Sequence, residues 1–376
     1  MADAEKLASK QKQISISEFF EKNKHFLGFD TLQRAVITAV KEAVDNSLDA
    51  CEETRILPDI NVEINRIGNE RLELICRDNG PGIPRDSIEN VFGKFLLGSR
   101  FHAIRQTRGQ QGIGITGVVM YSQLTTGSKT SVVSKIASDS SAVYVELGLD
   151  TRKNKATKSS ERRDVWFEDG EEIQHGLKIR TVMKAKYQRG RQSVHQYLRM
   201  TSIVNPHATI KLIVRDKEGE IIDQGNWIRT TDRLPRIVEE IKPHPHGIQL
   251  GQLQRMLKEA DERKLTSFLR HNFSGVSQRA AKEILNAAEL EEGRTPARIK
   301  GDEAQAMIEA FQGIKLLSPP TDCLSPIEEM LIKKGLSKAI DSRFASTVTR
   351  KPTVSLGNPF QIEVGLVFGG DLQSEG

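Results

Sequence analysis

Residues 31–56, TLQRAVITAVKEAVDNSLDACEETRI, are the stretch of this 376-residue chain from which the rest of the fold can be predicted. Apolar side chains recur in it at steps of three and four residues, for example Val36, Val40 and Val44. This spacing places one apolar stripe along a helix, and Pro58 stands just beyond its end. We therefore predict a single long amphipathic helix over residues 31–56.

The polar face of this helix carries a carboxylate and an amide together. Glu42 and Asn46 are four residues apart, so both side chains lie on the same helical face. An amide oxygen can ligate a hard cation such as Mg²⁺, and a carboxylate can accept a proton from an attacking water. A solvated acidic face would show the same pattern, and the helix alone does not decide between the two readings.

A carboxylate and two glycines follow the next predicted strands. Two strand-like runs, 60–66 and 71–77, flank a Gly-Asn turn, and the second run leads into the sequence DNGPGIP. Asp78 can accept a hydrogen bond from an exocyclic amine such as adenine N6. Gly80 and Gly82 would let a flat ring approach the backbone. An ordinary Asx turn could use the same residues.

A third segment, RGQQGIGITG at residues 108–117, is rich in glycine. Its glycines leave successive backbone N–H groups accessible, and the helix predicted directly after Gly117 would add its N-terminal dipole. No Gly-Lys-Ser/Thr closes the segment, and it follows a long loop rather than a strand. It is therefore neither a P-loop nor a dinucleotide fingerprint. We predict an anion cradle suited to phosphates.

The order of the predicted elements indicates the fold class. Beyond the glycine-rich segment we predict further strands at 130–137, 142–149, 163–168, 176–184 and 208–215. The polar stretch 151–164 is typical of a surface turn, and Ser17 is a plausible N-cap in a short apolar arm at 14–26. The chain is thus predicted to be α+β, beginning with an α/β sandwich that has helices on one face of a mixed sheet.

Composition excludes several classes of protein. Hydrophobic residues make up 37% of the chain and charged residues 28%, which is ordinary for a globular protein. No apolar run is long enough to span a bilayer, so we expect no membrane association. Cys51, Cys76 and Cys323 form no CxxC pair and predict neither a disulfide framework nor a zinc site. We expect a cytoplasmic protein.

Positive charge is concentrated in one part of the chain. Residues 151–200 hold 13 Lys and Arg against 6 Asp and Glu. Within them Lys184, Lys186, Arg189 and Arg191 form a run that contains no acidic residue. Such a local field suits a polyanion such as DNA, and it also suits a merely solvated face.

Two further segments follow the sandwich domain, which we assign with its N-terminal arm to residues 1–228. Residues 229–308 are dominated by helical runs and predict a small all-helical domain. After the Pro-rich linker LLSPPTDCLSP, a helix at 326–340 and two strands predict an incomplete α/β domain over 309–376.

The three motifs, in this order and spacing, resemble the GHKL ATPase superfamily and its Bergerat fold. Longer segments narrow the resemblance to the B-subunit family of DNA topoisomerase VI, a type IIB enzyme. They include VKEAVDNSLDACEE, FGKFLLGSRFH, RQTRGQQGIGI, AKYQRGRQSVHQYLRMTSIVNPHA, FLRHNFSGVSQRAAKEIL and VTRKPTVSLGNPFQIEVGLVFGG. The resemblance implies a GHKL ATPase domain, a helix-two-turns-helix domain and the start of a transducer domain.

The resemblance also implies roles for the motif residues, with ATP and Mg²⁺ as cofactors. Glu42 would be the general base for the water that attacks the γ-phosphate, and Asn46 would hold the Mg²⁺. Asp78 would select adenine, while Gly80 and Gly82 would allow close approach of the base.

Further residues would surround the nucleotide. Ser99 and Arg100 would belong to a lid over it. The residues expected to wrap the phosphates are consecutive: Gly109, Gln110, Gln111, Gly112, Ile113, Gly114, Ile115 and Thr116. The basic run at Lys184, Lys186, Arg189 and Arg191 would contact DNA.

The partners implied are double-stranded DNA, a second copy of the chain and the DNA-cleaving A subunit of topoisomerase VI. ATP would drive homodimerisation through the N-terminal arm, and two B with two A subunits would pass strands and relax supercoils in an archaeal cytoplasm. Because the transducer is incomplete, we expect ATP binding with slow hydrolysis. An ATP-gated DNA clamp without cleavage stays an alternative. A GHKL protein kinase is disfavoured, because no phospho-acceptor histidine helix precedes the motifs.

Overall fold

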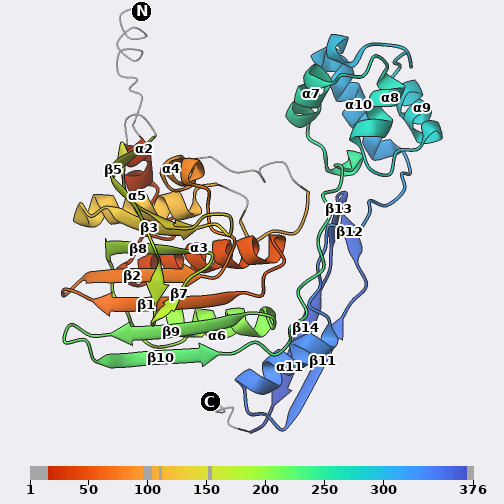
Figure 1. The fold of residues 1–376 in the computed structure, drawn as a ribbon. Helices are drawn as coiled ribbons and strands as arrows, with labels where there is room; N and C mark the ends of the chain where they lie inside the picture. The colour runs from red at the N-terminus through yellow and green to blue at the C-terminus, as the bar shows by residue number, and fades with distance from the viewer. Residues whose placement is uncertain (1–15, 96–103, 110–111, 151–154, 371–376) are drawn as a thin grey trace, which may run out of the picture.

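The computed structural model describes residues 16–95, 104–109, 112–150 and 155–370 of the chain. Their elements form three parts: a mixed sheet with helices packed on it, a bundle of short helices, and a helix with paired strands that lies between these two (Figure 1). The sheet part holds all three of the motifs singled out above.

Helix α3, Leu32–Glu53, is the long helix predicted from the apolar spacing, and it is confirmed. Thr31 caps its start by accepting a hydrogen bond from the backbone N–H of Arg34 at 3.2 Å. The apolar stripe is buried against the sheet, which leaves the face that carries Glu42 and Asn46 toward the glycine-rich segment. The buried residues of α3 are Ala35, Val36, Ala39, Val40, Ala43, Val44, Ser47, Leu48, Asp49 and Cys51.

Eight strands form one sheet in the order β10-β9-β1-β2-β8-β3-β4-β5. Their bounds are β1 Asp59–Arg66, β2 Arg71–Asp78, β3 Thr130–Lys135, β4 Ala142–Asp150, β5 Lys155–Asp164, β8 Gly176–Lys184, β9 Thr209–Arg215 and β10 Ile221–Trp227. Strands β1 and β9 are parallel and the other neighbouring pairs are antiparallel, so the predicted mixed sheet is confirmed. Alternate residues of β1 and β2 are buried, which shows that helices cover one face.

Four more helices pack on this part of the chain. They are α2 Ile16–Lys22, α4 Arg85–Gly93, α5 Gly114–Thr126 and α6 Val194–Val204. Phe20 of α2 is fully buried, with its ring centroid 5.6 Å from that of Phe29. Phe29 in turn stacks on Tyr121 of α5 at 4.6 Å. These rings attach the N-terminal segment to the core beside α3.

Three local predictions are wrong. The strand expected at 163–168 does not form as one element, because residues 163–164 end β5 and β6 covers only Phe167–Glu168. The polar stretch 151–164, expected to be a surface turn, holds strand β5, which pairs with β4 at the edge of the sheet. Nearly all of its side chains are exposed, so no apolar alternation marks it, and its backbone hydrogen bonds to β4 hold it. Ser17 is not an N-cap, because it is the second residue of α2. Strand β10, which sequence reasoning missed, lies at the other edge of the sheet, and Asp223 is its one buried residue.

The bundle of short helices forms a second core of its own. Its elements are α7 Leu250–Glu259, α8 Leu265–Asn272, α9 Gln278–Ala287 and α10 Gly301–Gly313, with the short 3-10 turns η1 Pro245–Gly247 and η2 Pro296–Arg298. The core contains Phe268, Phe273 and Phe311, and no described residue of the sheet part belongs to it. Helix α10 runs through position 308, where the boundary was predicted.

The third part begins with α11, Glu329–Ala339, and continues as paired strands. The predicted strands of this region are each divided in two: β11 Phe344–Thr349 pairs with β14 Glu363–Phe368, and β12 Thr353–Ser355 with β13 Asn358–Phe360. A similar short pair, β6 Phe167–Glu168 with β7 Glu171–Glu172, projects from the main sheet. Helix α11 packs against β11 and β14 and also against α6.

The contact between α11 and α6 is close. A Cβ at Gly335 would lie 2.7 Å from the backbone oxygen of Ile203, so only glycine allows this approach. Arg199 donates a hydrogen bond of 2.6 Å to the carbonyl of Ala339 at the end of α11. The third part is therefore seated directly on a helix of the sheet part.

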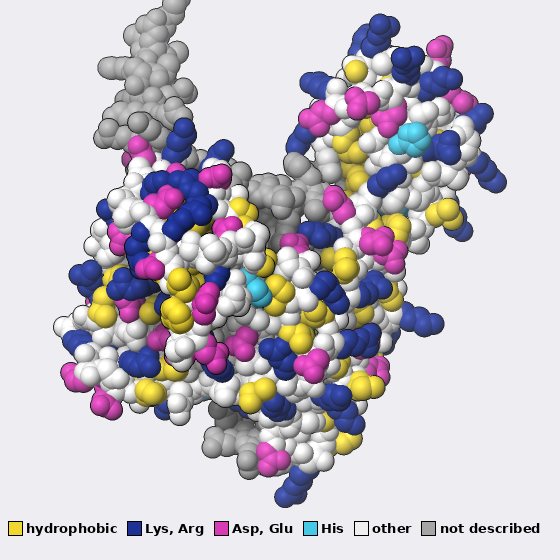
Figure 2. Space-filling view, viewed as in Figure 1, with side chains coloured by type: hydrophobic (Ala, Val, Ile, Leu, Met, Phe, Trp, Pro, Cys, Tyr) yellow, Lys and Arg dark blue, Asp and Glu magenta, His cyan; other side chains and the backbone are white. Residues whose placement is uncertain are grey.

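The outer surface is a mixture of charges. Figure 2 shows Lys and Arg side chains intermixed with Asp and Glu over the face in view, with hydrophobic side chains scattered between them. Within the described residues, no helix is both long enough and apolar enough to cross a membrane.

Candidate functional site

The three motifs border one cavity of about 1080 Å³ beside the central strands β2 and β8 of the sheet. Helix α3 contributes one wall, the end of β2 and the turn after it a second, and the glycine-rich segment a third. The residues from the predicted site that line it are Glu42, Asn46, Asp78, Gly82, Gly109, Gly112, Ile113, Gly114, Ile115 and Thr116. Segments far apart in the sequence thus meet as the motif order predicted.

Glu42 lies between this cavity and a smaller apolar one of about 160 Å³, which Phe20 and Phe29 help to line. Burial raises the pKa of the Glu42 carboxyl. The ammonium of Lys41, 3.7 Å away, lowers that pKa, and the nearby charge of Asp45 raises it. The net result is a carboxylate with a pKa above its ordinary value, which suits a proton acceptor near neutral pH.

Asn46 stands one helical turn beyond Glu42 and lines the same cavity. Its amide oxygen lies 3.9 Å from the position that a Cβ on Gly109 would occupy. Within the part of the chain that the structure describes, its side chain forms no hydrogen bond. An amide oxygen held at a cavity wall is a suitable ligand for a hard cation that keeps most of its waters.

Asp78 ends β2 and is almost fully buried. Its two oxygens accept hydrogen bonds from the Ser47 hydroxyl at 2.6 Å and from the Gly80 backbone N–H at 2.9 Å. Burial raises the pKa of Asp78, and the hydrogen bonds from Ser47, Gly80 and the Leu177 backbone act in the opposite direction. The carboxylate is thus held in one orientation at the edge of the cavity.

The turn after Asp78 needs glycine at one position above all. Gly82 has φ +73°, and a Cβ there would lie 2.2 Å from the backbone oxygen of Lys135. Gly80 does not line the cavity, and its carbonyl instead lies 2.9 Å from Nδ1 of His175. The two glycines thus shape the turn, while Gly82 alone of the pair borders the cavity.

The glycine-rich segment approaches α3 closely. Helix α5 begins at Gly114 rather than after Gly117, so residues 114–116 form its first turn with their N–H groups at the helix N-terminus. A Cβ on Gly114 would lie within 1.9 Å of Glu42 Oε2. Four of the predicted site residues, Ser99, Arg100, Gln110 and Gln111, lie outside the described residues.

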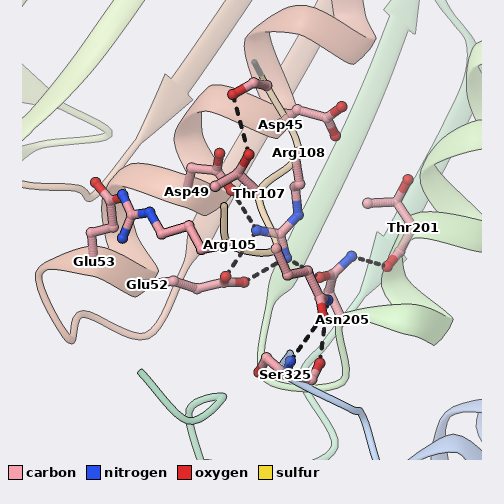
Figure 3. A network of polar contacts seen from close by, with 12 residues as sticks. Asp45, Asp49, Glu52, Glu53, Arg105, Thr107, Arg108, Thr201, Asn205 and Ser325 are labelled. Carbon is pink, nitrogen blue, oxygen red and sulfur yellow. Dashed lines mark hydrogen bonds and ion pairs between the residues drawn. The ribbon is translucent and has the colours of Figure 1, made fainter. Parts of the chain in front are cut away.

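Sequence reasoning missed a polar network beside the cavity (Figure 3). Arg108 donates to Asp49 at 2.7 Å and, with both terminal nitrogens, to Glu52 at 2.7 and 2.8 Å. Although burial alone would raise the pKa of Glu52, hydrogen bonds from His207 and Arg108 lower it. The one sequence signal for this network is the i, i+3 spacing of Asp49 and Glu52, which places both carboxylates on one face of α3.

The predicted DNA-contacting residues lie away from this cavity. Lys184 pairs with Glu70 at 3.1 Å, and Arg189 pairs at 2.9 Å with Asp223. Their side chains, with those of Lys186 and Arg191, are exposed at the end of β8 and just beyond it. The structure thus groups them on the surface but shows partners for some of their charges.

Comparison with known proteins identifies the family. Residues 31–153 match the family model described as histidine kinase-, DNA gyrase B- and HSP90-like ATPase. Residues 319–376 match the transducer of the topoisomerase VI B subunit. The B subunit of type 2 DNA topoisomerase 6 from Thermococcus gammatolerans is 36% identical over 423 residues, covering 100% of this chain and 73% of that protein. This chain belongs to the topoisomerase VI B subunit family.

Other members of the topoisomerase VI B subunit family are more similar in sequence. The protein from Methanococcoides burtonii is 49% identical over 373 residues, covering 99% of this chain and 58% of that protein. The one from Archaeoglobus fulgidus is 46% identical over 370 residues, covering 98% of this chain and 60% of that protein. The chain therefore spans about three-fifths of the length of these relatives.

The family assignment also confirms the predicted fold class: an α+β chain with a GHKL ATPase fold and the start of a transducer. Among solved structures, the MutL ATPase domain of Aquifex aeolicus, complexed with ADP, aligns at 17% identity and a TM-score of 0.31 over 51% of this chain and 63% of that one. So low a score adds nothing to the family assignment.

Proposed function

We propose that this chain is the ATP-binding and ATP-hydrolysing subunit of a type IIB DNA topoisomerase. The observation that carries the proposal is the meeting of Glu42, Asn46, Asp78 and the glycine-rich segment around a single cavity. The family assignment supports the same conclusion. Calorimetric titration with a non-hydrolysable ATP analogue and Mg²⁺ tests it, and the absence of binding heat and of competition by ATP would overturn it.

In the proposed reaction Glu42 orients the attacking water and accepts its proton. The carboxylate suits this role because it faces the first turn of α5, where the N–H groups of residues 114–116 would hold the phosphates. Phosphoryl transfer depends mainly on positioning and on neutralising charge. In this proposal α3 does the positioning and the glycine-rich segment does the neutralisation.

Asn46 would hold the Mg²⁺, which would supply positive charge to offset that of the phosphates. The described residues contain no group of three or more His, Cys, Asp or Glu side chains that could hold a metal ion. Asn46 would therefore supply one protein oxygen to the ion, since Mg²⁺ at phosphate sites commonly takes few ligands from the protein.

Asp78 would recognise adenine by accepting a hydrogen bond from its exocyclic amine. Because Ser47 and Gly80 already orient the carboxylate, the base would meet a fixed acceptor. The ring would lie near Gly82, which borders the same cavity.

The partners of the proposed enzyme follow from the family. We propose that two copies of the chain dimerise when ATP binds, and that the dimer joins two A subunits on double-stranded DNA in the cytoplasm. Co-purification of a cleavage subunit with a tyrosine nucleophile would support this assembly. Retention of DNA by the closed dimer in the absence of that protein would favour a clamp instead.

Removal of Lys41 tests the assignment of the base through the pH dependence of hydrolysis. The reaction needs ionised Glu42, so its rate should fall as pH decreases through the raised pKa of that carboxyl. Because Lys41 lowers this pKa, Lys41→Ala should move the acid limb of the kcat profile toward higher pH. Single-turnover rates across the acid range measure the shift.

The control for this experiment is Lys211→Ala, which removes an exposed lysine from β9. The control should keep the profile of the unmodified chain. An acid limb that stays in place in Lys41→Ala would contradict the role of Glu42 as the titrating base.

Substitution of the exposed basic run tests the proposed DNA contacts. Replacing Lys184, Lys186, Arg189 and Arg191 with alanine should weaken DNA binding. The slope of log affinity against log salt should flatten by about 0.9 for each DNA phosphate that these side chains no longer neutralise. Binding isotherms at several salt concentrations measure the slope.

A matched control removes four positive charges from the opposite edge of the sheet. The substituted residues are Lys155, Lys158, Arg162 and Arg163 of β5. The control should keep the original slope. Equal flattening in both variants would show that only the overall charge matters.

A further inference from the structure

The residues just before the glycine-rich segment, 104–108, connect the cavity to two other parts of the chain; we call them the stem. On one side the stem is attached to α3: Arg105 pairs with Glu53 at 2.8 Å, and Arg108 pairs with Asp49 and Glu52 (Figure 3). Two arginines of the stem thus attach it to α3, the helix that carries Glu42 and Asn46.

Arg108 also extends the attachment to α6, which packs beside α3. Its second terminal nitrogen donates at 2.5 Å to Oδ1 of Asn205, the residue that ends α6. Asn205 is itself oriented, because its amide nitrogen donates to the carbonyl of Thr201 at 2.8 Å. Arg108 thus ties the stem to α3 and to the end of α6 through charge-assisted hydrogen bonds.

On its other side the stem is paired with residues 321–325. The backbone N–H of Gln106 donates to the Cys323 carbonyl at 2.8 Å. Its side-chain oxygen accepts from the backbone N–H of Ser325 at 2.8 Å, and its side-chain nitrogen donates to the Ser325 carbonyl at 3.3 Å. Gln106 therefore bonds to the backbone of this segment much as a neighbouring β-strand would.

Residues 321–325 lie within the match to the transducer family, which begins at residue 319. Arg236 holds the same segment through the carbonyls of Leu324 at 2.7 Å and Thr321 at 3.0 Å. A few residues further on, Glu363 of β14 accepts hydrogen bonds from the backbone N–H groups of Ile327 and Glu328. The position of residues 321–325 is thus tied to the paired strands of the third part.

The stem also borders the cavity itself, since Thr107, Arg108 and the adjoining Gly109 all line it. Gln106 immediately precedes these three residues and makes all the direct stem contacts to Cys323 and Ser325 described above. We propose that Gln106 is a positioning residue that couples occupancy of the nucleotide cavity to the order of residues 321–325. The inference rests on the proposed function, because the occupant is the adenine nucleotide.

The physical basis of this coupling is thermodynamic linkage. A nucleotide that orders Thr107 to Gly109 lowers the entropy cost of keeping Gln106 paired with Ser325. By reciprocity, the same pairing strengthens nucleotide binding by the same factor. Loss of the Gln106 side chain should therefore remove the response at 321–325 and weaken nucleotide binding, without removing any group from the cavity wall.

Hydrogen exchange of the full chain, read by mass spectrometry, tests the coupling. The probe is a non-hydrolysable ATP analogue with Mg²⁺, and the peptides of interest cover residues 319–328. In the unmodified chain the analogue should slow exchange there by about five-fold or more. In Gln106→Ala this response should disappear, while calorimetry still detects the analogue with an affinity reduced by no more than about ten-fold.

Two variants distinguish coupling from a general structural effect. Gln106→Glu keeps the acceptor for the Ser325 N–H but loses the donor to the Ser325 carbonyl, so it should keep a reduced response. Gln305→Ala removes a glutamine of α10 that bonds to Glu309 on its own helix, far from the stem in the sequence, and it should change nothing. Gln106 is itself exposed, so its replacement leaves the core intact.

Several outcomes would overturn the coupling. They are a full response retained in Gln106→Ala, a response in Gln106→Glu larger than in the unmodified chain, or no response in the unmodified chain when calorimetry shows the analogue bound. Absence of binding in the unmodified chain would instead show that the proposed function has failed, and the coupling would fall with it.

Discussion

Glu42→Gln should lower the single-turnover rate of ATP hydrolysis by about 10²–10⁴-fold, while the ATP analogue still binds. The amide keeps the size of the side chain and its place beside Gly114, but it cannot accept the proton of the attacking water. Burial already raises the pKa of Glu42 and so disfavours its charged form. Removing that charge should therefore leave the thermal midpoint of unfolding unchanged or higher. Quench-flow hydrolysis, calorimetry and thermal melts on the same protein measure the three quantities.

The matched control is Glu283→Gln on α9, which removes a carboxylate that pairs with Arg279 on the same helix. It should keep the unmodified rate and affinity. A Glu42→Gln variant that hydrolyses ATP at the unmodified rate would contradict the assignment of the base. One that loses affinity together with rate would assign Glu42 to nucleotide binding rather than to chemistry.

The parts of the fold that could be predicted from the sequence are those whose signal is local. Helix α3 follows from apolar spacing at three and four residues, and β1 and β2 follow from alternating side chains around a Gly-Asn turn. Both signals report a buried face, and both elements lie in the centre of the sheet part. The mixed sheet could be predicted because helices stand before and after groups of consecutive strands in the chain.

Edge strands could not be predicted in this way. The side chains of β5 are nearly all exposed, so its sequence has the composition of a turn. Only its register with β4, from Ala142 opposite Asp164 to Asp150 opposite Lys155, makes it a strand. That pairing is a property of two segments together and leaves no pattern in either one.

The candidate site shows the same division. The spacing of Glu42 and Asn46 places them on one helical face. Asp78 could be predicted as a site residue from its position directly after a strand. The contacts around these residues could not be predicted, because they join distant parts of the sequence. Ser47 and Asp78 are 31 positions apart, and Arg108 and Asn205 are 97 positions apart. Gly80 could be predicted as part of the turn, but its absence from the cavity wall depends on the path of the turn in space.

Asp78→Asn should weaken binding of the ATP analogue by about 10- to 150-fold, as expected from the roughly 1.5–3 kcal/mol of a hydrogen bond to a charged group. The substitution replaces one acceptor oxygen with an NH₂ donor, which would face the amino group of adenine. It should also narrow the preference for ATP over GTP, since the purine of GTP carries a carbonyl acceptor at that position. Calorimetric titrations with both nucleotides measure the two effects.

The reason for expecting a loss of binding rather than of folding lies in the burial of Asp78. Burial raises its pKa, so a neutral side chain of the same shape should cost the folded state little. Ser47 can turn its hydroxyl to accept from the new amide. Asp86→Asn, at an exposed site in the first turn of α4, is the control and should keep full affinity. Unchanged affinity and unchanged ATP preference in Asp78→Asn would show that the base is recognised elsewhere, and the purine would then have to be placed against another wall of the cavity.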